Sequence, residues 1–328
     1  MEFMPEFSVA RPNSLIDLMA ARQAHPDACL LAGGTDLIAN IRRGIVAPEH
    51  LIELTNVAEL QGVAATDSGG LRIGAGVTLA ALIEDARVQS DYPVVADAAR
   101  EVAAATHREV ATVGGNLCLD TRCVYYNQSE WWRGANDYCL KSRGEICHVA
   151  PKGDHCFAAF SGDLAPALIV LDATVEIAAP AGMRRCPLQD IYADDGRAHL
   201  RLSAEDCLVA VELPAPNAGL RAGYAKARVR GAIDFPLAGV AVALSRASEI
   251  VTDLRVALTG VSSCPLLVAG ARDIIGAPLN EDALDRLVNL LPKQIQPMTS
   301  TFTPPGYRRK VIANLTRSLA RRLFEEAA

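Results

Sequence analysis

The sequence predicts an α+β fold, in which a two-subdomain N-terminal unit with an inserted loop precedes a C-terminal domain with a small antiparallel sheet and helices. Three observations lead to this class. The 328 residues are enough for two or three domains of ordinary size. Short apolar runs alternate with helical segments in the first two thirds of the chain, whereas the last third has strand-like runs followed by helical ones. Between them lies a stretch without apolar periodicity.

The first subdomain is expected over residues 1–56. The apolar run Cys29–Leu31 is followed by a glycine-rich turn at 32–36 and by a helical segment that starts at Leu37. This order is typical of a strand, a tight turn and a helix. A second strand is expected at 50–54.

The second subdomain is expected over 57–216, and it contains the inserted loop at about 118–160. The alanine-rich segment 94–105 predicts a helix, and Gly114 and Gly115 predict a tight turn. Long loops without regular structure inside compact domains usually have a function. Strands are expected at 71–75, 167–171, 174–177 and 208–213.

The C-terminal domain is expected over 217–328, after a proline-rich linker. Apolar runs predict antiparallel strands near 222–230, 236–244 and 250–260, and helices at about 281–291 and 306–326.

Composition narrows the class of protein. The 32 basic and 38 acidic residues give a net charge of −6, so the chain lacks the positive surface that nucleic acid binding requires. No apolar run is long enough for a membrane span, and the acidic N-terminal segment does not resemble a signal peptide. We therefore expect a cytoplasmic protein without nucleic acid or membrane partners.

Two glycine pairs have the chemistry of an anion site. The first pair lies in Ala32-Gly33-Gly34-Thr35-Asp36, between a predicted strand and a predicted helix. The second lies about eighty residues later in Thr112-Val113-Gly114-Gly115-Asn116, again with a hydroxyl and an amide side chain beside the glycines. Backbone N–H groups at such turns can receive a pyrophosphate. Either pair alone is more often a simple turn or helix cap. Neither matches the dinucleotide fingerprint or the Walker loop, which disfavours a nicotinamide domain.

Five of the nine cysteines fall between positions 118 and 156. An odd number, unevenly spread, favours reduced thiols or metal ligands over a disulfide framework. Cys123, Cys139, Cys147 and Cys156 have gaps of 15, 7 and 8 residues, and this spacing does not name the metal. The alternatives are an iron–sulfur cluster, free cysteines in a solvated loop, and a zinc-clamped interaction module whose glycine pairs are merely turns. A buried anionic cluster is favoured by the basic residues interleaved with the cysteines, which are Arg122, Arg133, Lys141, Arg143 and Lys152. His148 and His155 are further candidate ligands, although surface histidines are the commoner case.

The ordered set of motifs resembles the medium, FAD-binding subunits of the xanthine dehydrogenase family of molybdenum hydroxylases. The resemblance covers essentially the whole chain. It rests on Ala-Gly-Gly-Thr-Asp-Leu at 32–37, Thr-Val-Gly-Gly-Asn at 112–116, Gly-Asp-Leu-Ala-Pro at 162–166, Tyr-Ala-Lys at 224–226, Asp-Phe-Pro-Leu-Ala at 234–238 and Tyr-Arg-Arg at 307–309.

This resemblance implies a FAD between the two N-terminal subdomains. The residues that match the family's FAD contacts are Leu30, Leu31, Ala32, Gly33, Gly34, Thr35, Asp36, Leu37, Thr112, Gly114, Gly115, Asn116, Asp163, Leu208, Tyr224 and Lys226. The two glycine segments would wrap the pyrophosphate, and Asp163 would bind flavin-side hydroxyls. Lys226 would lie near the isoalloxazine carbonyls, and Tyr224 is either a ring against the flavin or a core residue.

The 46 residues between Asn116 and Asp163 depart from the family's short connection. The insertion looks like that of the flavoprotein subunits in the 4-hydroxybenzoyl-CoA reductase branch, where the extra loop carries a 4Fe-4S cluster beside the FAD. This resemblance implies Cys123, Cys139, Cys147 and Cys156 as cluster ligands. Trp131 and Trp132 are expected to shield the cluster or pack the loop.

The same resemblance implies an oxidoreductase subunit without catalytic residues of its own. Electrons from ferredoxin would pass through the 4Fe-4S cluster and FAD to a small subunit with two 2Fe-2S clusters. They would end at a large molybdenum cofactor subunit that dehydroxylates 4-hydroxybenzoyl-CoA to benzoyl-CoA in anaerobic aromatic degradation. A dimer of heterotrimers is expected. The alternative in the same family is the FAD subunit of an oxidising hydroxylase, of the aldehyde or purine dehydrogenase type.

Overall fold

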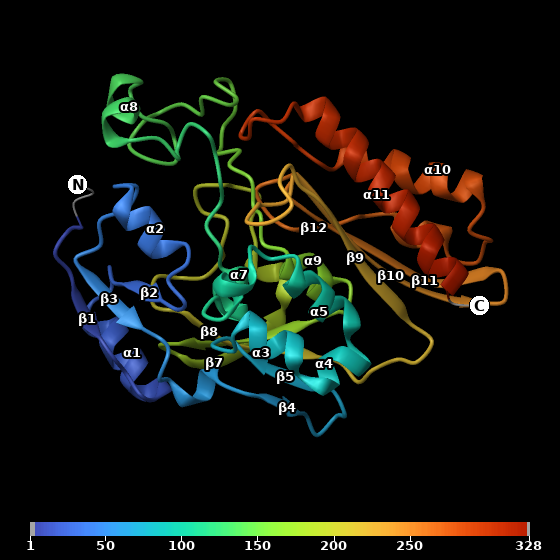
Figure 1. The fold of residues 1–328 in the computed structure, drawn as a ribbon, viewed down its shortest axis with the longest axis horizontal. Helices are drawn as coiled ribbons and strands as arrows, with labels where there is room; N and C mark the ends of the chain where they lie inside the picture. The colour runs from blue at the N-terminus through green and yellow to red at the C-terminus, as the bar shows by residue number, and fades with distance from the viewer. Residues whose placement is uncertain (1–3, 327–328) are drawn as a thin grey trace.

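The computed structural model describes residues 4–326, and its strands form three separate sheets (Figure 1). Residues 1–3 of the predicted first subdomain and residues 327–328 of the predicted C-terminal domain lie outside the described part. The mixture of a small parallel sheet, a larger antiparallel sheet and a C-terminal antiparallel sheet with helices confirms the predicted α+β class.

The N-terminal region is a three-stranded parallel sheet with strand order β1-β3-β2. Helix α1 begins after Ser14, whose hydroxyl accepts a hydrogen bond from the Asp17 N–H at 3.1 Å and so caps the first turn. The predicted strand, turn and helix at 29–42 are present as β2 and α2. The elements are β1 (Ser8–Ala10), α1 (Leu15–Ala24), β2 (Cys29–Leu31), α2 (Leu37–Arg42) and β3 (His50–Glu53).

The middle region is a five-stranded antiparallel sheet with strand order β4-β5-β8-β6-β7. Its strands are β4 (Val63–Ala65), β5 (Leu71–Gly74), β6 (Thr174–Ala179), β7 (Gly182–Pro187) and β8 (Cys207–Leu213). Its helices are α3 (Leu79–Glu84), α4 (Ala86–Asp91), α5 (Pro93–Arg100), α6 (Ala105–Arg108), α7 (Val113–Leu117) and α9 (Leu164–Ile169).

One predicted strand is wrong. The apolar run 167–171 belongs largely to helix α9, and β6 pairs instead with β7 through a turn at 180–181. All six residues of α9 are buried. A helix that is apolar all round has no amphipathic period, so a short apolar run does not distinguish it from a buried strand.

The C-terminal region is a four-stranded antiparallel sheet with strand order β12-β11-β10-β9. Side chains of β10 alternate between its two faces. Val240, Val242 and Leu244 pack with the helices α10 and α11, whereas Ala241 and Ala243 face the core of the middle region. The elements are β9 (Arg221–Ala227), β10 (Ala238–Ala247), β11 (Ile250–Thr259), β12 (Leu266–Leu267), α10 (Glu281–Leu290) and α11 (Pro305–Glu326).

The insertion at 118–160 contains a single short helix, α8 (Glu130–Ala135), which begins at the cap residue Ser129. In Figure 1 it forms a lobe that stands apart from the sheets. Short 3₁₀ helices complete the fold: η1 (Ala58–Leu60), η2 (Leu188–Ile191), η3 (Ala271–Ile274) and η4 (Leu291–Lys293). Among residues 4–326, no helix has the length and apolarity needed to cross a membrane.

Candidate functional site

The first glycine pair forms a turn that only glycine fits. A Cβ atom on Gly33 would lie 1.9 Å from the backbone oxygen of Val110, and Gly34 has a φ of +70°. Gly33 therefore allows the turn after β2 to press against the chain just before Thr112. Asp36 follows the turn at the start of α2, where its carboxylate accepts a hydrogen bond from the Asn40 amide at 3.1 Å.

The second glycine pair does not form the expected tight turn but the first turn of helix α7. Thr112 is the cap residue, and its Oγ1 accepts a hydrogen bond from the Gly115 N–H at 3.0 Å. Its hydroxyl proton stays available to a second acceptor. A Cβ atom on Gly114 would lie 2.8 Å from the Ala75 Cβ, so this glycine allows close packing on the segment after β5.

The structure brings the two glycine segments side by side. A Cβ atom on Gly115 would lie 3.8 Å from the Cβ of Ala32, with the Thr112 hydroxyl as its closer neighbour at 3.1 Å. Leu30, Leu31, Gly33, Gly34 and Leu37 are half-buried, and Thr35 is exposed. Residues eighty positions apart thus form one surface of backbone and small side chains, which suits the close approach of a pyrophosphate. Their contacts with FAD remain a prediction.

Asp163, Tyr224 and Lys226 form a buried polar cluster between the middle and C-terminal regions. The Tyr224 hydroxyl donates to Asp163 Oδ1 at 2.6 Å, and Lys226 Nζ donates to Asp163 Oδ2 at 3.1 Å and to the Glu101 carbonyl at 2.9 Å. Burial raises the pKa of Asp163 to about 6, against the opposing charge of Lys226 and the Tyr224 hydrogen bond. The structure brings these three predicted residues together.

Two further predicted residues have structural contacts of their own. Asn116 is buried, and its side-chain oxygen accepts a hydrogen bond from the Leu164 N–H at 3.0 Å, which ties the second glycine segment to α9. Leu208 lies in β8 opposite Ile177 and belongs to the apolar core of the middle region. Its side chain contributes to packing of that core, and its predicted FAD contact stays a prediction.

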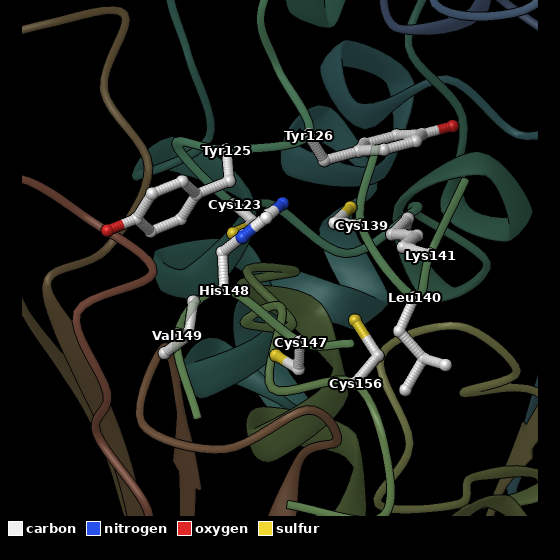
Figure 2. Close-up of a pocket in the computed structure, with 10 residues that line it drawn as sticks. All are labelled: Cys123, Tyr125, Tyr126, Cys139, Leu140, Lys141, Cys147, His148, Val149 and Cys156. Atoms are coloured by element: carbon white, nitrogen blue, oxygen red, sulfur yellow. The ribbon is translucent and has the colours of Figure 1, made fainter. Parts of the chain in front are cut away.

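The four cysteines of the insertion line one pocket (Figure 2). Cys123, Cys139, Cys147 and Cys156 come from separate irregular segments of the loop, and their exposed fractions are 6, 8, 4 and 4%. Figure 2 shows the four sulfur atoms around a common space. Within residues 4–326, no three or more His, Cys, Asp or Glu side chains are arranged to hold a single metal ion.

Burial disfavours the ionised form of two of these thiols, Cys123 and Cys156. Desolvation raises the pKa of Cys123, and it raises the pKa of Cys156 to about 12. A hydrogen bond from the Ala158 N–H and the positive charge of Lys141 oppose this rise at Cys156. A raised pKa disfavours the free thiolate, so Cys123 and Cys156 suit a metal group, which compensates the thiolate charge, better than nucleophilic chemistry.

Arg122 connects the glycine segments with the cysteine pocket. It precedes Cys123, forms an ion pair with Asp36, and donates to the Asn40 side-chain oxygen at 3.3 Å. Its guanidinium also lies over the Phe235 ring, with 5.2 Å to the ring centroid. Burial lowers the pKa of Arg122 to about 10. One side chain thereby joins the first glycine segment, the first cysteine and the C-terminal region.

The sequence placed Lys141 among the basic residues interleaved with the cysteines, and it placed Trp131 as a shield of the cluster or a packing residue of the loop. Lys141 lines the cysteine pocket with a side chain that is only 5% exposed, but no local motif distinguishes it from the other basic residues of the loop. Trp131 is 79% exposed, so the expectation that it shields a cluster or packs the loop is wrong. His148 lines the pocket and contacts the Tyr138 carbonyl, whereas His155 pairs with Asp154.

Comparison with known families covers almost the whole chain. Residues 5–216 match the FAD binding domain in molybdopterin dehydrogenase, and residues 222–323 match the CO dehydrogenase flavoprotein C-terminal domain. The chain belongs to the FAD-binding subunits of the molybdenum hydroxylase family.

Relatives in this family are similar along most of their length. The FAD-binding subunit PaoB of an aldehyde oxidoreductase from Escherichia coli K12 is 34% identical over 82% of this chain and 85% of its own. The carbon monoxide dehydrogenase medium chain of Afipia carboxidovorans is 27% identical over 96% of both chains. A crystal structure of a Cu,Mo-CO dehydrogenase has a TM-score of 0.81 and 25% identity, and it covers 99% of this chain and 100% of its own.

These comparisons confirm the family and the fold predicted from the sequence. The insertion alone favoured a 4-hydroxybenzoyl-CoA reductase over an oxidising hydroxylase. The names of the relatives reverse this ranking, because they support an oxidising hydroxylase better.

Proposed function

We propose that this chain is the electron-transfer subunit of an oxidising molybdenum hydroxylase that acts on an aldehyde, and that it holds FAD and one 4Fe-4S cluster. The observation that carries the electron-transfer role is the placement of four buried thiols around one pocket, joined through Arg122 to the paired glycine segments. The 34% identity to an aldehyde oxidoreductase subunit supports the substrate class.

The residues present fit both groups. Gly33 and Gly115 leave backbone and small side chains along one surface, as close approach to a pyrophosphate requires. A 4Fe-4S cluster is held by four cysteine thiolates, and four buried cysteines line this one pocket.

FAD exchanges two electrons and a 4Fe-4S cluster one, so together they would connect a two-electron oxidation at molybdenum with a one-electron carrier such as ferredoxin. The chain itself contributes binding and positioning. Cys123, Cys139, Cys147 and Cys156 would hold the cluster, and the glycine segments with Asp163 and Lys226 would hold the FAD. A large molybdenum subunit and a small subunit with two 2Fe-2S clusters would complete each half of a dimer of heterotrimers.

A 4-hydroxybenzoyl-CoA reductase subunit is the second candidate, favoured by the cysteine insertion, which resembles that branch of the family. It differs from the first in the substrate and in the direction of electron flow.

Steady-state assays of the purified complex distinguish the two. We expect oxidation of aldehydes with an artificial acceptor, and no benzoyl-CoA from 4-hydroxybenzoyl-CoA with a low-potential donor. Benzoyl-CoA formation without aldehyde oxidation would reverse the choice. Iron, sulfide and zinc analysis of the same sample tests the cluster separately. The visible spectrum is a second test, because a zinc protein would have no absorption beyond that of the flavin and the 2Fe-2S centres.

A further inference from the structure

Lys141 is the buried cation of the cysteine pocket. It follows Cys139 by two positions and lines the same pocket as the four cysteines. Its side chain is 5% exposed, whereas Arg143 and Lys152, which follow it in the loop, are exposed. A charge in such a poorly hydrated place acts on its neighbours more strongly than one in water.

The Lys141 ammonium is fixed by several oxygen atoms. It donates to Asp120 Oδ1 at 2.7 Å, to the Gly196 carbonyl at 2.8 Å and to the Thr121 carbonyl at 3.3 Å, and it also contacts the Thr121 hydroxyl. It lies 5.1 Å from the centroid of the Tyr126 ring. These contacts hold the charge at one position on the wall of the pocket.

The same contacts hold the pocket itself together. The Gly196 N–H donates to the Cys156 carbonyl at 2.7 Å, and the Cys156 N–H donates to Asp195 Oδ1 at 3.1 Å. Lys141 therefore joins the segment before the first cysteine to the loop that anchors the last one. Asp120, its partner of opposite charge, has a side chain that is 39% exposed.

We propose that Lys141 and Asp120 form a charge pair that sets the reduction potential of the cluster, with effects of opposite sign. This inference rests on the proposed 4Fe-4S cluster. Reduction adds one negative charge to a group that four thiolates already make negative, so a nearby positive charge favours the reduced form. Without Lys141, the cluster would lose that charge and face the unpaired carboxylate of Asp120 as well.

Lys141→Met should therefore lower the cluster potential, and Asp120→Asn should raise it. We expect each variant to change the equilibrium constant of reduction about tenfold, which is about 59 mV for one electron. The potential is measured on the purified complex by redox titration followed by electron paramagnetic resonance. Iron content is measured on each sample.

Matched controls remove the same charges from exposed positions in the same loop. Lys152→Met and Asp154→Asn alter residues whose side chains face solvent, and the Asp154 side chain is 96% exposed. Because solvent and salt screen such charges, both controls should keep the wild-type potential.

The outcomes separate this inference from the proposed cluster. A wild-type complex with no iron assigned to this chain refutes the cluster. With the cluster present, unchanged potentials in Lys141→Met and Asp120→Asn, or shifts of both in the same direction, overturn the charge pair. If Lys141→Met binds no iron, Asp120→Asn decides: a raised potential supports the pair and an unchanged one refutes it. Loss of iron from both variants shows a purely structural role and also overturns the inference.

Discussion

The glycine segments and the cysteine insertion lie next to each other but are held in place differently. The glycine segments belong to regular elements, and their shape follows from backbone packing, such as Gly33 against Val110. The insertion has one six-residue helix, and Cys123, Cys139 and Cys156 pack with Tyr126 in a small core that also includes Ile45 of the N-terminal region. Shape at the flavin side is therefore expected to survive loss of the cluster, whereas the insertion depends on what its cysteines bind.

The largest effect on the flavin side is expected from Gly33→Ala. The added methyl group would meet the Val110 backbone oxygen, so the turn and the chain before Thr112 must separate. We expect loss of FAD from the complex, measured by flavin absorbance after gel filtration, with the cluster iron retained. Gly306→Ala is the matched control, because a Cβ there has no neighbour within 4 Å. Full FAD content in Gly33→Ala would show that the turn does not shape the site.

Gly115→Val tests contact with the ligand more directly than packing. A Cβ at Gly115 meets only the Thr112 hydroxyl at 3.1 Å and the Ala32 Cβ at 3.8 Å, so the chain itself can accommodate a small substituent with minor adjustment. The branched side chain would occupy the surface between the two glycine segments. We predict weaker FAD binding, by at least tenfold in Kd, in a protein whose circular dichroism is unchanged. A folded variant with stoichiometric FAD would contradict the assignment.

Asp163 should give the polar cluster a specific pH dependence. Its folded pKa of about 6 lies above the ordinary aspartate pKa of 3.8, so between these pH values the folded protein holds a proton that the unfolded chain has released. The free energy of unfolding from this group therefore falls as pH rises through about 4 to 6. Asp163→Asn should remove that slope. Thermal denaturation of the complex from pH 4 to 7, followed by flavin fluorescence, measures the difference, and parallel wild-type and variant curves would refute it.

Within the insertion, Trp131 and Tyr126 should differ sharply in their contribution to stability. Trp131→Ser removes a side chain that is 79% exposed, so we expect a change within about 0.5 kcal/mol and unaltered iron and FAD. Tyr126 is 8% exposed and lies under the cations of Arg133 and Lys141, so Tyr126→Ala should cost about 3 kcal/mol or more. Limited proteolysis of the loop measures both, and equal sensitivity of the two variants would contradict this account.

The sequence predicted features whose signal is local. The strand and helix around Gly33, the three long C-terminal strands and the helix at 305–326 follow from short motifs or clear periodicity. The helix α9 was predicted in part as a strand, because burial on all sides removes its amphipathic pattern. Arg122 and Lys141 were expected as basic residues beside the cysteines, but their partners were not predictable. Lys141 contacts Gly196, 55 positions away, and such contacts are set by the folded chain.

The most direct test of the central claim compares iron, acid-labile sulfide and FAD in wild-type and Cys139→Ser complexes. Cys186→Ser, at a half-buried cysteine outside the insertion, is the control and should match the wild type. The account predicts that Cys139→Ser loses about four irons and four sulfides per copy of this chain and keeps its FAD. Identical iron and sulfide contents in the wild-type and Cys139→Ser complexes, or one zinc per chain in the wild type, would contradict it.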